Sequence, residues 1–192
     1  MSTKYSKDLQ DYIVVFENII SNDLCDIILS EYKNSNDWKV GAVGADSAIN
    51  SNIRNTSVIA LGAPIILEKN PQVRKYIDRE MFKCAGTVLS KYNELFPKSG
   101  MIRDTGYALL RYTPDQFYTE HVDCSNANPR SISCSFAIND DYDGGEFSFW
   151  EKEKVYRLKK GDCIMFPSNF MYPHEIIPVT KGIRYSIVTW FI

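Results

Sequence analysis

Two histidines and one aspartate are the residues of this chain whose types and spacing suggest metal chemistry. His121 and His174 are the only histidines among 192 residues, and Asp123 follows the first by two positions in the segment YTEHVD. Residues two apart in a β-strand project from the same face, so His121 and Asp123 are expected to point together. Two imidazoles and a carboxylate suit a non-haem Fe(II) ion with open positions. The sequence therefore predicts a site formed by His121, Asp123 and His174.

Other interpretations of these residues stay open at this point. Either histidine could be an ordinary core or surface residue, because His-x-Asp is a weak motif. Zinc could use the same three ligands, although structural zinc normally closes its fourth position with another protein ligand and no candidate for one is evident. The triplet alone therefore does not decide between a structural and a catalytic site.

A possible anchor for a carboxylate follows His174 at a distance of ten residues. Arg184 and Ser186 lie in GIRYSIVTW, where strand geometry would place them on one face. A guanidinium fork with a neighbouring hydroxyl matches a carboxylate. A buried arginine without an acidic partner is costly, so this position predicts a carboxylate from the protein or from a ligand. A surface arginine paired with a glutamate is the alternative.

The elements that would position these residues are mostly short strands. From Gly106 onward, β-prone runs alternate with the turn segments DDYDGG, KKGD, FPSN and TKG. About eight short strands at regular spacing predict an all-β barrel or a double-sheet jelly roll. The predicted strand runs are YALLRY, SISCSFAI, EFSFW, KVYRL, CIMF, EIIPV and YSIVTWFI, besides the YTEHVD segment.

Helices are predicted only before this region. After an opening strand in DYIVVFENII, Ser21 or Asn22 can cap a helix that runs to about Lys33. A long helix should begin at Asn70-Pro71 and end at Phe96-Pro97. Its expected core-facing stripe is Val73, Ile77, Met81, Cys84, Val88, Tyr92 and Leu95.

The predicted fold is therefore mainly β with flanking helices (α+β), in which the N-terminal helices pack on one sheet of the barrel or jelly roll. We expect one domain over residues 1–192, in which residues 1–105 supply helical support and outer strands and residues 106–192 supply the core strands.

Composition excludes several classes of protein. The formal net charge is -2, which gives no general attraction for nucleic acid. Five cysteines without a CxxC pair predict free thiols and a reducing compartment. No signal peptide or membrane-spanning run is evident, so we expect a cytoplasmic protein without a membrane partner.

Six segments in fixed order carry a family resemblance. They are LLRYTPDQFYTEHVD, RSISCSFAIND, DGGEFSFW, LKKGDCIMFP, YPHEIIPV and GIRYSIVTWFI. In these, residues 107–192 resemble the catalytic core of the 2-oxoglutarate- and Fe(II)-dependent dioxygenases and are most similar to the prolyl 4-hydroxylase-like branch. The resemblance implies that the core is a double-stranded β-helix, that is, a jelly roll. The earlier FENIISNDLCDIIL resembles the usual entry to that fold, with less specificity.

The resemblance implies a role for each of ten residues. The iron ligands would be His121, Asp123 and His174; the 2-oxoglutarate-binding residues Arg184, Ser186, Tyr112 and Ser133; and the substrate-binding residues Tyr118, Trp190 and Arg54. The aromatic residues could equally be core packing.

Two features depart from this resemblance or extend it. Many relatives have a tyrosine four residues after the Ser133 position, where this chain has Ala137, so the co-substrate pocket could be wider or differently hydrogen-bonded. The Gly- and Ser-rich stretch 40–52, VGAVGADSAINSN, could form a lid over a peptide groove or an ordinary surface loop.

The function that the resemblance implies is hydroxylation of prolyl residues in a peptide or protein, with release of succinate and CO2. Its cofactors would be Fe(II), 2-oxoglutarate as co-substrate and O2, with ascorbate as a further candidate. One alternative keeps the chemistry but acts on a free amino acid, another side chain or a nucleobase. A second alternative is a non-catalytic metal-binding jelly roll used for recognition. No oligomeric state is predicted.

Overall fold

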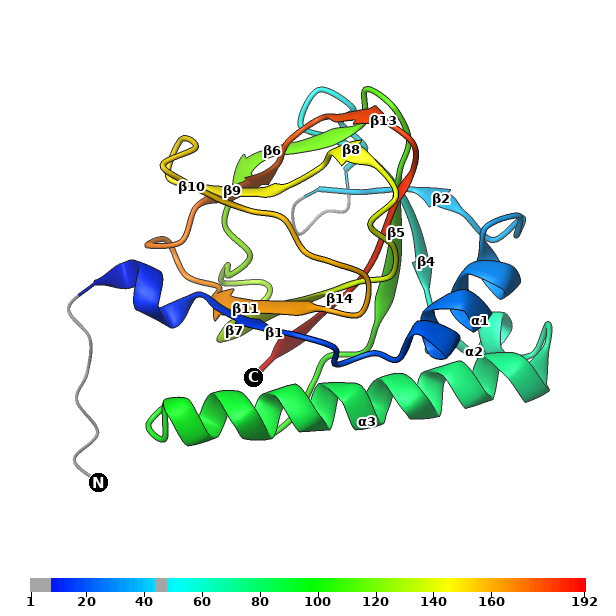
Figure 1. Cartoon of the computed structure of the whole chain (residues 1–192), viewed down its shortest axis with the longest axis horizontal. Helices are drawn as coiled ribbons and strands as arrows, with labels where there is room; N and C mark the ends of the chain where they lie inside the picture. The colour runs from blue at the N-terminus through cyan, green and yellow to red at the C-terminus, as the bar shows by residue number, and fades with distance from the viewer. Residues whose placement is uncertain (1–7, 44–47) are drawn as a thin grey trace.

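The computed structural model describes residues 8–43 and 48–192, and its strands form two large antiparallel sheets (Figure 1). The seven-stranded sheet has the order β1 (Val14–Phe16), β11 (Cys163–Pro167), β7 (Ile132–Ala137), β14 (Arg184–Phe191), β5 (Ala108–Tyr112), β4 (Ser57–Ala60), β2 (Lys39–Val40). The five-stranded sheet has the order β10 (Lys154–Tyr156), β9 (Phe147–Phe149), β12 (His174–Ile176), β6 (Phe117–His121), β3 (Arg54–Asn55). β13 (Val179–Lys181) and β8 (Asp143–Gly144) form a separate pair.

The two large sheets pack face to face, and helices cover the outer face of the larger one. One core cluster joins side chains of both sheets, among them Leu110 and Phe166 from the larger and Phe149 and Ile176 from the smaller. A second cluster joins the larger sheet to the helices. The helices are the 3-10 helix η1 (Leu9–Tyr12), α1 (Asn22–Tyr32), α2 (Pro64–Leu67) and α3 (Pro71–Leu95). The predicted jelly roll with helices on one sheet is confirmed.

Strand β14 shows how one sequence serves both layers. Tyr185, Ile187 and Phe191 belong to the cluster beneath the helices, whereas Arg184 and Ser186 line a cavity on the other face. Because side chains alternate along a strand, an apolar set packs on the helices while polar side chains enter the space between the sheets. The predicted common face of Arg184 and Ser186 is confirmed.

The two predicted helices lie close to their expected boundaries. The Ser21 side chain accepts a hydrogen bond from the backbone N–H of Leu24 at the start of α1. Helix α3 begins at Pro71 and runs along the outer face of the larger sheet in Figure 1. Its predicted stripe is wrong at Leu95, which is 54% exposed at the last residue of the helix. Ala85 and Arg74 are buried on this face although the stripe omitted both.

Arg74 enters the core because acidic residues meet it there. Its guanidinium forms ion pairs with Glu31 of α1 at 2.5 Å and with Asp37 at 2.8 Å. Burial would lower the pKa of Arg74, but the hydrogen bonds to these two carboxylates raise it above its ordinary value. The pairs therefore keep a buried charge compensated and link α3 to α1.

Each predicted strand run contains a strand, but two were drawn too long. Only Val14–Phe16 of the opening run pairs, as β1. EIIPV is divided between β12 and β13, because Pro178 lacks the N–H that a continuous ladder needs. The strands from the first 105 residues lie at or next to sheet edges. They are therefore outer strands of the two sheets.

Two expectations from composition concern cysteine and membrane spans. All five cysteines are free thiols, as predicted. Within residues 8–43 and 48–192, none of the helices is both long enough and apolar enough to cross a bilayer.

Candidate active site

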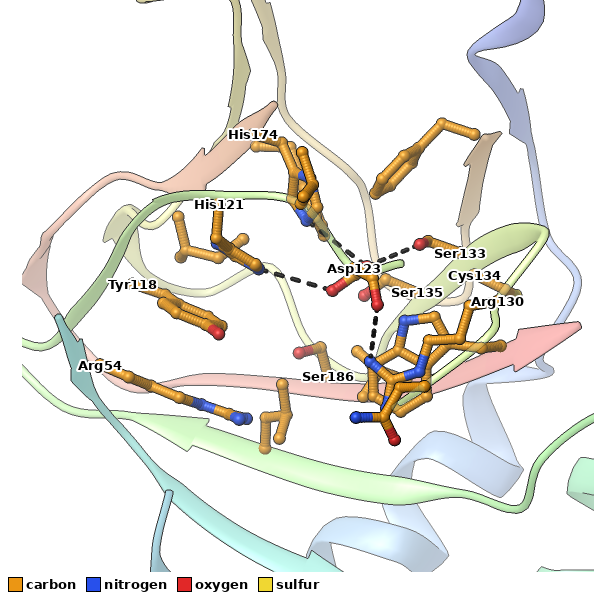
Figure 2. A pocket seen from close by; sticks show the side chains of 18 of the residues that line it. Arg54, Tyr118, His121, Asp123, Arg130, Ser133, Cys134, Ser135, His174 and Ser186 are labelled. Carbon is orange, nitrogen blue, oxygen red and sulfur yellow. Dashed lines mark hydrogen bonds and ion pairs between the residues drawn. The ribbon is translucent and has the colours of Figure 1, made fainter. Parts of the chain in front are cut away.

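The three candidate metal ligands converge between the sheets. β12 pairs with β6 in antiparallel register, and this places His174 opposite His121. Their Nε2 atoms each lie 3.6 Å from an oxygen of Asp123, His121 from Oδ1 and His174 from Oδ2. One ligand atom from each of the three residues lies within 4.8 Å of the others. Figure 2 shows both rings directed at the carboxylate.

Asp123 reaches this position by a route other than the predicted one. β6 ends at His121, so Asp123 lies in the following loop and does not share a strand face with the histidine. Its carboxylate is held instead by Ser133 of β7, whose hydroxyl donates a hydrogen bond to Oδ2 at 2.6 Å. The strand geometry was therefore the wrong reason for a juxtaposition that the tertiary structure produces.

Backbone carbonyls fix the tautomers of both histidines. Nδ1 of His121 lies 2.8 Å from the carbonyl oxygen of Thr119, and Nδ1 of His174 lies 3.1 Å from that of Tyr172. A carbonyl oxygen only accepts hydrogen bonds, so each Nδ1 carries the proton. The lone pair is then on Nε2, the atom that faces Asp123, as a metal-binding imidazole requires.

The ionisation states also suit a cation. Burial and the neighbouring His121 together lower the pKa of His174 to about 4 although Asp123 opposes them, so the His174 imidazole is neutral at pH 7. Burial alone would raise the pKa of Asp123, but the two histidines and the Ser133 hydroxyl together hold it well below its usual range. The partly buried Asp123 carboxylate thus stays ionised beside the neutral imidazole of His174, and these are protonation states of metal ligands.

These residues line a cavity of about 370 Å³. All ten residues predicted for the site lie along its wall, although they come from seven separate strands or loops: His121, Asp123, His174, Arg184, Ser186, Tyr112, Ser133, Tyr118, Trp190 and Arg54. The structure therefore brings together every residue of the predicted site.

Arg184 is buried in this cavity, and no aspartate or glutamate among the described residues forms an ion pair with it. The residue is 3% exposed, and its Nη1 donates to the Ser186 hydroxyl at 2.8 Å. Its guanidinium carbon lies 5.2 Å from the ring centre of Tyr112, its neighbour across the strands, and 5.4 Å from that of Phe147. Nε has no hydrogen-bond partner within the described chain. A buried guanidinium with free donors requires an anion, and the protein side chains described here do not provide one.

The three residues predicted to bind substrate lie on another side of the cavity. The Tyr118 ring stacks on His121, with ring centres 3.5 Å apart and planes 15° apart. Arg54 of β3 pairs in register with Tyr118 and places its guanidinium 4.9 Å from the centre of that ring. The guanidinium of Arg130 lies over the ring of Trp190, with its central carbon 3.4 Å from the centre of that ring.

Ser133 and Ala137 lie on the same strand, β7, but have different surroundings. The Ser133 hydroxyl donates to the candidate metal ligand Asp123 and also contacts the Ser168 hydroxyl at 2.8 Å. Ala137 pairs with Ser186 and packs in the core between the sheets. Ser135, between them on β7, has a buried hydroxyl with no partner in the described chain.

The stretch 40–52, considered as a lid, is described in part. Residues 44–47 lie outside the described residues. Val43 and Ala48 form an antiparallel bridge, and the Ala42 carbonyl accepts a hydrogen bond from Arg54 at 2.8 Å. Ala42 also lines the cavity. The described part of this stretch therefore borders the site.

Two residues of the site escaped the reasoning from sequence. Arg130 lies seven positions after Asp123 in a polar loop, where an arginine normally faces solvent, and its contact with Trp190 is purely tertiary. Ser168, in the predicted turn FPSN, is 1% exposed and contacts Ser133. Neither position carries a local signal that distinguishes it from a surface loop residue.

Known proteins match the part of the chain that forms this site. Residues 107–192 match the sequence model of the 2OG-Fe(II) oxygenase superfamily. A PKHD-type hydroxylase of Idiomarina loihiensis is 34% identical over 86 residues, which are 42% of this chain and 38% of that protein. Procollagen-lysine,2-oxoglutarate 5-dioxygenase 1 of Gallus gallus is 27% identical over 90% of this chain but 23% of its own length. The chain thus spans well under half of these relatives.

Solved structures match nearly the whole chain. A prolyl hydroxylase of Trichoplax adhaerens, in complex with a hypoxia inducible factor peptide fragment, superimposes with a TM-score of 0.78. The match has 17% identity and covers 94% of this chain and 83% of that one. The viral collagen prolyl hydroxylase of Paramecium Bursaria Chlorella virus-1, in a 2OG complex, gives 0.68 at 17% identity, with 94% and 95% covered. At this identity the likeness establishes the fold.

Proposed function

We propose that this protein hydroxylates prolyl residues of a peptide or protein, because residues 107–192 match the sequence model of the 2OG-Fe(II) oxygenase superfamily and the chain is similar to PKHD-type and prolyl hydroxylases. It would use Fe(II), 2-oxoglutarate and O2 and release succinate and CO2. The observation that carries the proposal is a buried guanidinium without an acidic partner, in the same cavity as two imidazoles and a carboxylate.

The donor set fits Fe(II). Two neutral nitrogen donors and one carboxylate oxygen meet at one point, with their remaining polar atoms already engaged by the backbone or by Ser133. Such a set holds one face of an octahedral ion and leaves positions for other ligands. Among the described residues these three form the only such cluster, so a fourth protein ligand that would close a tetrahedral zinc site is absent there.

The cavity also fits a dicarboxylic keto acid. Arg184, Ser186 and Tyr112 would hold the carboxylate that is remote from the metal. The Nε of Arg184 has no hydrogen-bond partner among the described residues, and its Nη1 donates to the Ser186 hydroxyl, which brings both groups to the same side of the cavity. The strand register β14–β5 keeps Tyr112 opposite Arg184. Gly145 leaves the space that this arginine occupies, since a Cβ there would approach Arg184 Cδ to 2.9 Å.

The protein's own contribution to the reaction is geometry and exclusion of water. When bound, Fe(II) would activate O2 with 2-oxoglutarate as the two-electron reductant, so that one oxygen atom enters a C–H bond and the other enters succinate. His121 and His174 keep their lone pairs on the metal side, and Asp123 contributes a fixed negative charge. The walls formed by Phe147, Phe166 and other apolar side chains keep the cavity poor in competing ligands.

A recognition module without catalysis is disfavoured by Arg184. Binding a metal for structural purposes does not require Arg184, whereas a buried cationic group with unsatisfied donors costs stability unless a ligand compensates it. The site therefore contains one set of residues for a metal and another for an anion. A catalytic site uses both sets, whereas a structural metal site would use only the first.

The test is mass spectrometry of proline-containing peptides incubated with the protein, Fe(II), 2-oxoglutarate, O2 and ascorbate. We expect a gain of one oxygen on proline and an equal amount of succinate, and neither product from the Asp123→Ala variant. Oxygen on a residue other than proline would support the alternative that the enzyme hydroxylates another side chain. Succinate formation that no peptide stimulates would indicate a small-molecule substrate. Absence of both products would refute the proposal.

A further inference from the structure

Two arginines of the cavity have no task in the chemistry proposed above. Arg54 and Arg130 enter it from different walls, and their side chains extend towards each other from opposite sides of the view in Figure 2. Each is positioned by an aromatic ring that the cavity shares, Tyr118 for Arg54 and Trp190 for Arg130. Rings beneath guanidinium groups restrain them while leaving the in-plane N–H donors free.

Arg54 keeps donors unsatisfied. Its Nη1 donates to the Ala42 carbonyl at 2.8 Å, and its Nε is a buried atom without a partner among the described residues. A buried N–H that stays unpaired costs free energy, so a ligand that accepts from it is favoured.

Arg130 is likewise held but not neutralised. Its Nη1 donates to the backbone carbonyl of Asp123 at 3.3 Å, which leaves its other donors for a ligand. Burial lowers the pKa of Arg130, and the positive charge of Arg54 adds to this, although Asp123 opposes it. The two guanidinium groups therefore repel each other across the cavity.

The charges of the remaining site do not compensate these two. Within the described ranges, neither Arg54 nor Arg130 forms an ion pair with an aspartate or glutamate side chain. A divalent metal ion and Arg184 together balance Asp123 and a doubly charged keto acid. With metal and keto acid bound, the formal charges of the site sum to zero apart from those of Arg54 and Arg130. Their two positive charges can therefore attract a negatively charged group of the substrate.

We infer that Arg54 and Arg130 form a subsite for a carboxylate of the substrate, next to the metal. The inference rests on the proposed function and adds to it that the hydroxylated residue lies beside an acidic side chain or a C-terminal carboxylate. Forked donors on two sides match carboxylate oxygens in a bidentate manner. A nucleic acid does not fit, because the chain has a formal net charge of -2.

The test measures dissociation constants by titration calorimetry with the protein loaded with Mn(II) and 2-oxoglutarate. Three pentapeptides share one proline. The first has blocked ends and glutamate beside the proline; the second has glutamine there; the third has glutamine and a free C-terminal carboxylate. We expect the first or the third to bind at least about tenfold more tightly than the second, as charge-assisted hydrogen bonds allow. Which of the two does so identifies the source of the carboxylate.

Variants connect this preference to the two arginines. The double variant Arg54→Gln, Arg130→Gln should lose the preference, while Arg79→Gln, a 64% exposed side chain on α3, should keep it. If circular dichroism shows that the double variant is misfolded, Arg54→Gln and Arg130→Lys are compared singly. Arg130→Lys keeps the charge but loses the fork, so it should keep only part of the preference.

Each result decides the inference. Equal binding of the three peptides overturns it, as does binding too weak to measure for all of them or a preference that survives in the variants. Binding of 2-oxoglutarate to the Mn(II) protein is measured first, without peptide. If that binding is absent, the proposed function fails; if it is present while the peptides bind alike, only the carboxylate subsite fails.

Discussion

Replacing Ser133 by alanine should weaken metal binding although Ser133 is not a predicted metal ligand. Its hydroxyl donates to Asp123 Oδ2 at 2.6 Å; Ser133 is 3% exposed, and the side chain of Asp123 is 12% exposed. The hydrogen bond fixes the orientation of a carboxylate that lies beyond the end of its strand. The substitution therefore leaves all three ligands in place but loosens one of them.

The magnitude follows from the kind of hydrogen bond. A bond to a charged group contributes about 1.5–3 kcal/mol, and each 1.36 kcal/mol corresponds to about a tenfold change in affinity. We therefore expect Ser133→Ala to weaken metal binding roughly 10- to 100-fold, the range typical for residues that orient metal ligands. The pKa of Asp123 should also rise towards its ordinary value, because Ser133 is one of the groups that lower it.

Anaerobic competition between the protein and a metal indicator for Fe(II) measures this change. The matched control is Ser135→Ala, two residues along the same strand, whose hydroxyl is buried and has no partner in the described chain. Its affinity should change by less than about twofold, since no hydrogen bond is lost. Equal weakening in both variants would refute the reasoning, because the effect would then come from the strand and not from the bond to Asp123.

Three further predictions concern ligand binding, pH and thiol reactivity. Arg184→Lys keeps a positive charge but loses the fork, so calorimetry should show the dissociation constant for 2-oxoglutarate increasing about tenfold or more; an unchanged constant would contradict the assigned anchor. In the metal-free protein, the pKa of His174 is about 4 when folded and about 6.5 when unfolded, so the unfolded state binds more protons between these values. Urea titrations should show the free energy of unfolding decreasing by about 3 kcal/mol as pH falls from 6.5 to 4, and His174→Gln should remove that part of the slope; identical slopes in both proteins would contradict it. Burial raises the pKa of Cys25 to about 12 and that of Cys134 well above its ordinary value, so iodoacetamide at pH 8 should modify both only after denaturation, and modification of the folded protein would count against their burial.

Long or strongly patterned features were predictable from the sequence. Helix α3 has a proline at its first position, a proline just after its end and a sustained apolar stripe, and its boundaries match the prediction. The strands near the C-terminus alternate clearly and are separated by turn residues. The five short strands β2, β3, β4, β8 and β13 were not predicted as such, because two to four residues leave too little periodicity.

The metal-binding half of the site was also predictable, for a simple reason. With two histidines in the chain, a site that needs two imidazoles has one choice of them. The partners that orient them were not predictable. The carbonyls of Thr119 and Tyr172 and the hydroxyl of Ser133 become neighbours of the ligands only when β6, β7 and β12 come together.

Arg130 illustrates that tertiary contacts of a site residue cannot be predicted from its local sequence. An arginine in a polar loop reads as a solvated charge, and its stacking on Trp190 joins positions 60 residues apart. Arg54 was placed near the substrate by resemblance alone, but its unpaired Nε and its pairing with Tyr118 follow only from the strand register.

The most direct test is calorimetry under anaerobic conditions, in which Fe(II) and then 2-oxoglutarate are titrated into the metal-free protein. One Fe(II) should bind per chain, 2-oxoglutarate should bind tightly only after the metal, and the His174→Ala variant should lose both. Tight binding of 2-oxoglutarate without metal, or undiminished binding of Fe(II) by the variant, would contradict a centre built from His121, Asp123 and His174.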